Sequence, residues 1–152
     1  MSDQDLLQLY STRILALAAD IPRLGRLDAP QGTARKRAPL CGSTIGVEVT
    51  LENGRIAGFA QDVRACALGQ AAASVLGATV VGLTPDEVRQ GRDGLRAMLR
   101  DGAEPPGAPW EALAVLIPAR DHPNRHGSIL LAFEATIEAL EQAVGQKKAA
   151  AT

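Results

Sequence analysis

Hydrophobic residues near the start of the chain recur every three or four positions: Leu6, Leu7, Tyr10, Ile14 and Leu17. This spacing predicts an amphipathic helix that ends before Pro22. Residues 21–40 then show no sustained period, contain prolines and glycines, and carry the basic cluster Arg35-Lys36-Arg37. We expect this stretch to be a loop that crosses the surface, with the basic cluster on its solvated face.

Apolar and polar residues alternate strictly over positions 45–52, and a second apolar stretch follows at positions 55–59. Between them stands Asn53-Gly54, a pair that tolerates positive φ and predicts a β-hairpin with a two-residue primed turn. Such a turn fixes the register, so residues whose numbers sum to 107 should face each other. The same ladder, extended to its far end, places Cys41 opposite Cys66 with Cβ atoms about 5 Å apart.

Two helices are predicted after the hairpin. Residues 67–81 are rich in Ala and Gly, which suits a helix that packs closely on the hairpin and has Cys66 at its N-terminus. The run Thr84-Pro85-Asp86-Glu87 is a capping box with Pro at the first helical position, and it predicts the start of another helix. We expect Gly91 and Gly94 to split that second helix.

The remainder of the chain predicts a linker loop over residues 101–109 and a short buried helix over residues 110–117. A final helix should run from about Ser128, as its N-cap, to Val144. Hydrophobic residues of this helix keep a 3-4 spacing and are expected in the core: Leu130, Phe133, Ile137, Leu140 and Val144. We therefore expect one domain over residues 1–145 and a frayed tail over residues 146–152.

Charge is nearly balanced over the 152 residues, with 16 basic and 17 acidic side chains and a formal net charge of −1. This balance argues against nucleic acid and against a membrane surface as partners. The first ten residues carry acids where a secretory signal would carry positive charge, and no stretch approaches the roughly 18 apolar residues of a membrane helix. We expect a cytoplasmic protein, in which the two cysteines stay reduced.

Cys41 and Cys66 are the candidate reactive residues. The unpaired N–H groups at a helix N-terminus favour a thiolate, so Cys66 is suited to metal binding or sulfur chemistry. Beside Cys41, Gly42 allows close approach of the backbone and Ser43 offers a hydroxyl. Two neighbouring thiolates suit zinc, copper(I) or an iron-sulfur unit. The alternative is that both cysteines are inert, because cysteine is among the most buried residue types.

His122 and His126 lie just before the predicted final helix. Either ring can ligate a metal, although an exposed loop or cap position is the more usual role of such residues. Sequence position determines neither the tautomer nor the direction of the rings, so both interpretations stay open.

Several segments resemble, in order, the NifU/IscU-like family: LY at 9–10, PRLG at 22–25, PLCGS at 39–43, RACALGQAAAS at 64–74 and PNRHGSILLAFEA at 123–135. The family shows Pro-x-Cys-Gly-Asp before a hairpin, a Cys followed by small residues and Ser-x-Ala-Ser after it, and Pro-x-Arg-x-x-Cys towards its end. The match covers residues 5 to 144 or so. It implies an α+β, IscU-like fold, in which helices pack on one side of a small antiparallel sheet of about three strands.

The resemblance also implies a site of three cysteines and an aspartate, which this sequence matches only in part. Cys41 and Cys66 take two of the cysteine positions, whereas Ser43 replaces the Asp and Ser128 replaces the third Cys. Gly127 stands where the IscU-type branch has His. The candidate metal ligands are therefore Cys41 and Cys66, with the hydroxyls of Ser43 and Ser128 as weaker ones.

The function that the resemblance implies is a scaffold for iron-sulfur cluster assembly rather than an enzyme. Cys41 and Cys66 would bind iron or a [2Fe-2S] cluster, in one chain or across a homodimer. A cysteine desulfurase would supply the sulfur, and recipient apo-proteins would take the cluster. Other functions stay open: a zinc-dependent or metal-free sulfurtransferase or desulfurase partner with Cys41 as persulfide acceptor, a degenerate adaptor that binds no metal, and a redox dithiol.

Overall fold

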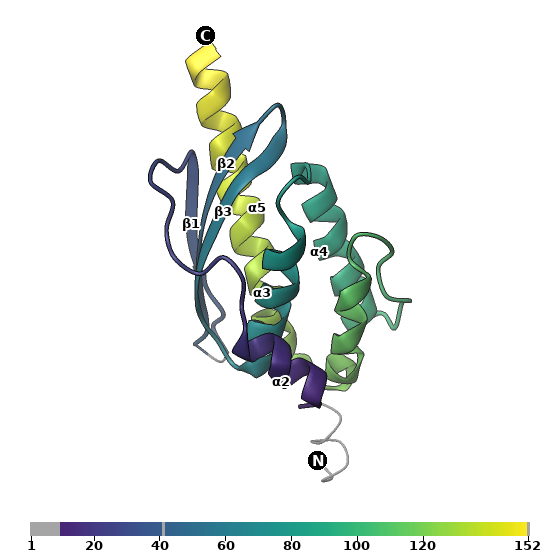
Figure 1. Ribbon diagram of the computed structural model, residues 1–152. Helices are drawn as coiled ribbons and strands as arrows, with labels where there is room; N and C mark the ends of the chain where they lie inside the picture. The colour runs from purple at the N-terminus through teal and green to yellow at the C-terminus, as the bar shows by residue number, and fades with distance from the viewer. Residues whose placement is uncertain (1–9, 41, 152) are drawn as a thin grey trace.

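The structure is a computed structural model that describes residues 10–40 and 42–151, with side chains described as far as residue 146. Its elements in chain order are α2 (Thr12–Ala19), β1 (Gly32–Arg37), β2 (Thr44–Glu52), β3 (Arg55–Arg64), α3 (Ala67–Thr79), α4 (Pro85–Arg100), the 3-10 helix η1 (Glu111–Asp121) and α5 (Pro123–Ala151). The strands form one antiparallel sheet in the order β1-β2-β3. The helices cover one face of this sheet (Figure 1), so the α+β class predicted from the resemblance is confirmed.

The core lies between the sheet and the two helices that pack on it, α3 and α5 (Figure 1). Every second residue of β2 points into this core and is buried: Ile45, Val47, Val49 and Leu51. The predicted stripe of α5 meets them, since Leu130, Phe133, Ile137 and Leu140 are buried and Val144 packs on the same core. Both periodicities read from the sequence therefore describe the core correctly.

The predicted hairpin is present, but its register is only partly as expected. Asn53 and Gly54 have φ values of 55° and 77°, as a primed turn requires. Beyond the pair Leu51↔Ile56, a β-bulge shifts the ladder by one residue, and it ends at Thr44↔Arg64. The predicted register is thus wrong along most of the hairpin, because a bulge adds an unpaired residue to one strand. The register arithmetic behind the predicted pairing of Cys41 with Cys66 therefore does not hold, and the pairing itself stays a prediction because Cys41 lies outside the described residues.

The expected loop over residues 21–40 contains strand β1, so that prediction is wrong from Gly32 to Arg37. Some residues of β1 that face the helices are small, and the others are long and polar. The alternation of apolar and polar residues that is typical of a strand is therefore missing. α5 crosses directly above Gly32, where a Cβ atom would collide with the backbone oxygen of Ala139. Contact with a helix more than 100 residues later therefore selects glycine at a position where a strand normally carries an apolar side chain.

Helix α2 begins at Thr12, with the Ser11 hydroxyl as N-cap, and ends before Pro22 as predicted. Tyr10 lies in a turn, so the expected helix does not run continuously through it, and its first part falls outside the described residues. Ser11 explains the start, because its side chain accepts the Ile14 N–H at 3.3 Å and satisfies a donor of the first turn.

Helix α4 begins at the predicted capping box, in which Thr84 and Glu87 each accept the other's backbone N–H. The expected break at its two glycines is wrong, because α4 is continuous to Arg100. A Cβ atom on Gly91 would lie 2.6 Å from the ring of Trp110, and one on Gly94 would lie 3.0 Å from Pro106. These glycines therefore allow close packing of the segment after the helix and do not end it.

The final helix α5 starts at Pro123, five residues earlier than expected. Ser128 is consequently inside the helix and is not its N-cap, and the preceding 3-10 helix η1 continues through Pro118, where an end was expected. Proline suits the first position of a helix because its missing N–H would have no partner there. α5 extends to Ala151, and fraying of residues 146–152 stays a prediction. None of the helices that the structure describes combines the length and hydropathy needed to span a bilayer.

Candidate functional site

Three of the predicted site residues come together at one end of the sheet. Ser43 directly precedes β2, Cys66 directly precedes α3, and Ser128 lies in the second turn of α5. The hydroxyls of Ser43 and Ser128 are 2.9 Å apart, and the Ser128 hydroxyl is 3.5 Å from the Cys66 sulfur. Residues separated by up to 85 positions in sequence thus form one hydrogen-bonded cluster.

Cys66 occupies the position predicted for it, at the N-terminus of a helix. Its backbone is extended, with φ −67° and ψ 169°, and its carbonyl oxygen accepts the N–H of Gln70 at 2.9 Å. Its side chain makes no capping hydrogen bond to the first turn of α3, and the residue is partly exposed. The thiol is therefore not used to cap the helix, and its described neighbour is the Ser128 hydroxyl.

Ser128 is nearly inaccessible, at 1% exposure, because α3 and α5 approach closely beside it. A Cβ atom on Gly69 would lie 2.7 Å from the Ser128 hydroxyl and 3.1 Å from its carbonyl oxygen. Gly69 therefore permits the contact between the helices that brings Ser128 to Cys66. We did not predict this role from sequence, where Gly69 is one of several small residues in an Ala-rich run.

Ser43 is held by the connection between β1 and β2. The N–H of Ala38 donates to the carbonyl oxygen of Ser43 at 2.9 Å, and the N–H of Gly42 donates to the carbonyl oxygen of Ala38 at 2.9 Å. Gly42 has φ 72°, a conformation that glycine adopts without strain. Cys41 belongs to this connection but lies outside the described residues, so its parts as ligand and as persulfide acceptor stay predictions.

The described side chains do not by themselves make a metal site. Ligands around a tetrahedral metal lie roughly 3.3–3.8 Å from one another, given metal–ligand bonds of about 2.0–2.3 Å. The 3.5 Å from Cys66 to Ser128 falls in this range, whereas the two serine hydroxyls at 2.9 Å are at hydrogen-bond distance. Within residues 10–40 and 42–146, no three His, Cys, Asp or Glu side chains form a group that could hold a metal ion. One thiol and two hydroxyls fit an iron-sulfur cargo only if Cys41 and an outside ligand complete them.

One of the two histidines departs from the expectation. His126 is buried at 5% exposure inside α5, so its interpretation as an exposed loop or cap residue is wrong. Its Nε2 atom is 2.9 Å from the carbonyl oxygen of Ala119. A carbonyl only accepts, so Nε2 carries a proton and is not free to bind a metal. His122 ends η1 and does cap that helix.

Solved structures, and not family models or curated proteins, show what the chain is similar to. No model of a protein family matches the sequence, and no curated protein matches it significantly. Among solved structures, a candidate iron-sulfur cluster assembly scaffold protein for the SUF system from the thermophile Fervidobacterium islandicum AW-1 has the same fold. It is 18% identical with a TM-score of 0.80, over 88% of this chain and 98% of that one.

A second solved structure is much more similar in sequence. It is the N-terminal part of a nitrogen-fixing NifU-like protein from Brucella abortus, with 36% identity and a TM-score of 0.90. The alignment covers 93% of this chain and 98% of that chain. With that identity over nearly the full length of both chains, the protein belongs to the NifU-like N-terminal domain family.

Proposed function

We propose that the protein is an iron-sulfur cluster assembly scaffold, which holds iron or a [2Fe-2S] cluster as its cargo. The observation that carries this proposal is the cluster of Ser43, Cys66 and Ser128, which brings three positions of the family's site within hydrogen-bond distance. The solved structure from Fervidobacterium, described as a candidate scaffold of this kind, has the same fold. The protein would work by binding and releasing the cargo and would not be an enzyme.

In this proposal Cys66 is one ligand and Cys41 is the second. The hydroxyls of Ser43 and Ser128 are the remaining candidates, but a neutral hydroxyl binds iron far more weakly than a thiolate does. The two hydroxyls also share a hydrogen bond, which a bound metal would have to break. We therefore propose that the cargo is held loosely and that another chain, either a partner or a second copy, contributes a ligand. Weak retention suits a protein that passes its cargo on.

The sulfur of the cluster would come from a cysteine desulfurase, and recipient apo-proteins would take the finished cluster. We place this exchange in the cytoplasm, where thiols stay reduced. The partial exposure of residue Cys66 supports such transfers, because another protein can approach it without unfolding the site.

Replacement of Cys66 by Ser should abolish cluster binding. Protein produced and purified without oxygen should contain iron and sulfide in similar amounts, and Cys66→Ser should lose both together with the visible absorbance of the cluster, because a serine hydroxyl is a poor substitute for a thiolate. Chemical analysis of iron, zinc and sulfide per chain measures the effect.

Ser74→Ala is the matched control, because Ser74 is a buried serine of the same helix whose hydroxyl bonds the Asp20 carbonyl oxygen. This variant should keep the cluster. Wild-type protein that contains no metal and cannot take up iron and sulfide would refute the scaffold.

A second function is favoured by the ligand shortage itself, since the described residues offer one thiol and no group of three strong ligands. The protein would then accept sulfur as a persulfide, with Cys41 as acceptor and with zinc or no metal at the site. Zinc without iron, together with faster turnover of a cysteine desulfurase, would identify this role. An adaptor without metal would instead bind a desulfurase without accepting sulfur.

A further inference from the structure

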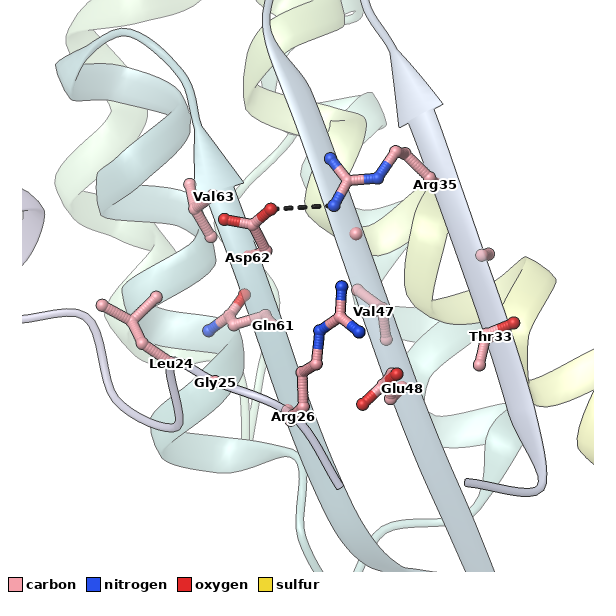
Figure 2. A pocket seen from close by; sticks show the side chains of 13 residues that line it. Leu24, Gly25, Arg26, Thr33, Arg35, Val47, Glu48, Gln61, Asp62 and Val63 are labelled. Carbon is pink, nitrogen blue, oxygen red and sulfur yellow. Dashed lines mark hydrogen bonds and ion pairs between the residues drawn. The ribbon is translucent and has the colours of Figure 1, made fainter. Parts of the chain in front are cut away.

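The sheet has a hollow on the face that the helices leave open. Figure 2 shows this outer face, which is the side of the sheet away from α3 and α5 and includes Arg35, Gly46, Glu48 and Asp62. The hollow measures about 680 Å³. A volume of this order suits a drug-sized molecule or a short segment of another protein.

Small residues form the floor of the hollow. Residues 23–27, which we call the strap, form one wall. Gly46 and Ala60 line the floor, and the Arg35 guanidinium lies over Gly46, 2.8 Å from where a Cβ atom would be. The strap around Leu24 is fixed to β3, because the N–H of Gly25 donates to the Gln61 carbonyl oxygen at 3.0 Å. It is also fixed to β2 by the Leu27 N–H, which donates to the Glu48 carboxylate at 2.7 Å. The hollow is therefore a built feature of the sheet.

The lining of the hollow carries two arginines, Arg26 and Arg35, and two acids, Glu48 and Asp62, and Arg37 and Arg64 at the end of the sheet add positive charge to the face. The two acids of the lining are already engaged: Asp62 accepts from Arg35 at 2.8 Å, and Glu48 accepts the strap's backbone N–H. The hydrogen bond from Arg35 and, in smaller part, the charges of Arg35, Arg64 and Arg26 hold the pKa of the Asp62 carboxyl below its usual range, so Asp62 stays charged. Among the described residues, no acid lies within ion-pair distance of Arg26 or Arg37.

Arg26 and Arg37 lie along the face and not at one point. In Figure 2 the Arg26 side chain rises from the strap towards the centre of the hollow, and the Arg35–Asp62 pair closes the far end. Arg37 follows Arg35 by two residues on the same side of β1, a step of about 7 Å along the strand. Leu24 adds an apolar rim at 59% exposure. Two separated cations and one apolar contact match an extended chain better than one small anion.

We propose that the outer face binds an acidic segment of a partner protein, with carboxylates on Arg26 and Arg37 and an apolar side chain on Leu24. At one end of this face the last paired residues of the three strands are Arg37, Thr44 and Arg64. Ser43 and Cys66 lie within two residues of them in the chain. A partner bound here would therefore lie next to the cluster of Ser43, Cys66 and Ser128. This inference does not depend on the proposed function, because it concerns a different set of side chains.

The test is a binding titration followed by heteronuclear NMR, with the acidic peptide acetyl-Glu-Leu-Glu-Gly-Glu-Leu-Glu-amide as probe. The expected shifts map to the strap and to the outward residues of β1 and β3. The double variant Arg26→Glu/Arg37→Glu should bind the peptide about tenfold more weakly or worse, since two attractive contacts become repulsive. Binding should also weaken as salt rises from about 50 to about 300 mM.

The matched control is Arg13→Glu/Arg100→Glu, which changes net charge equally at two exposed arginines of α2 and α4. It should bind the peptide like the wild type. Leu24→Ser, at an exposed and therefore tolerant position, should weaken binding without changing charge. Equal weakening by both double variants, or equal binding of a peptide with Lys in place of Glu, would overturn the proposal.

Two further measurements distinguish an acidic protein segment from nucleic acid as the ligand, and the docking surface from the scaffold function. An oligonucleotide of thymidine that binds the same residues more tightly than the peptide would assign the face to nucleic acid and overturn the acidic protein segment. Cys66→Ser should bind the peptide normally. Normal peptide binding by a protein that never takes up iron or sulfur would leave the docking surface standing and refute only the scaffold function.

Discussion

The double variant Ser43→Asp/Ser128→Cys should bind zinc about a thousandfold more tightly than the natural chain. The change restores the carboxylate and thiol that the family resemblance implies, at two hydroxyls that lie 2.9 Å apart and beside Cys66. A structural zinc site with four ligands has a binding free energy of about 10–16 kcal/mol, or roughly 3 kcal/mol per ligand, so two strong ligands in place of weak ones justify at least this gain. Competition with a coloured chelator measures the affinity.

The control for this experiment is Ser74→Cys, which adds a thiol at a buried serine of α3 whose hydroxyl hydrogen-bonds elsewhere. Its zinc affinity should equal that of the wild type. An unchanged affinity of the double variant would mean that residues 43 and 128 do not border a metal site, and the ligand assignment would then be wrong. Each single variant should give an intermediate affinity.

Replacement of Gly32 by Val should cost about 3 kcal/mol or more of unfolding free energy. A Cβ atom there would collide with the backbone oxygen of Ala139 and lie 2.9 Å from the backbone nitrogen of Ala143. The backbone of a helix cannot rotate away as a side chain can. The loss of unfolding free energy should therefore reach the upper end of the range for overpacked cores. Urea unfolding followed by circular dichroism measures it.

Gly145→Ala tests the same helix without the collision, because no atom lies within 4 Å of the added Cβ. It should stabilise the protein by roughly 0.5–1 kcal/mol, which is the usual gain of Ala over Gly in a helix. If Gly32→Val were equally harmless, the close contact between β1 and α5 would not exist in solution. The strand that sequence analysis missed would then need another explanation.

Local sequence signals predicted several elements of the site correctly. The Asn53-Gly54 turn placed two strands, because few residue pairs accept positive φ at both positions. The run of small residues after Cys66 placed that cysteine at the start of α3. These predictions succeed because their interactions lie within a few residues of one another.

Predictions failed where distant residues decide the conformation. The bulge beyond Leu51 moves the ladder by one position, so arithmetic from the turn could not locate the partners of residues near the cysteines. Ser128 was expected to cap α5, yet it lies inside that helix, beside Cys66 and Ser43. Its neighbours come from two other elements, and no local pattern encodes them.

The sequence by itself determined that Cys66 begins a helix after a hairpin, and that the positions of Asp and the third Cys in the family's site are serines here. Only the tertiary structure decided that Ser43, Ser128 and Cys66 form one hydrogen-bonded cluster and that no acid among the described residues lies within ion-pair distance of Arg26 or Arg37 on the open sheet face. The difference has one physical cause. Turns and caps depend on neighbouring residues, whereas the cluster exists because Gly69 lets α5 approach α3, a contact between segments roughly 60 residues apart in the chain.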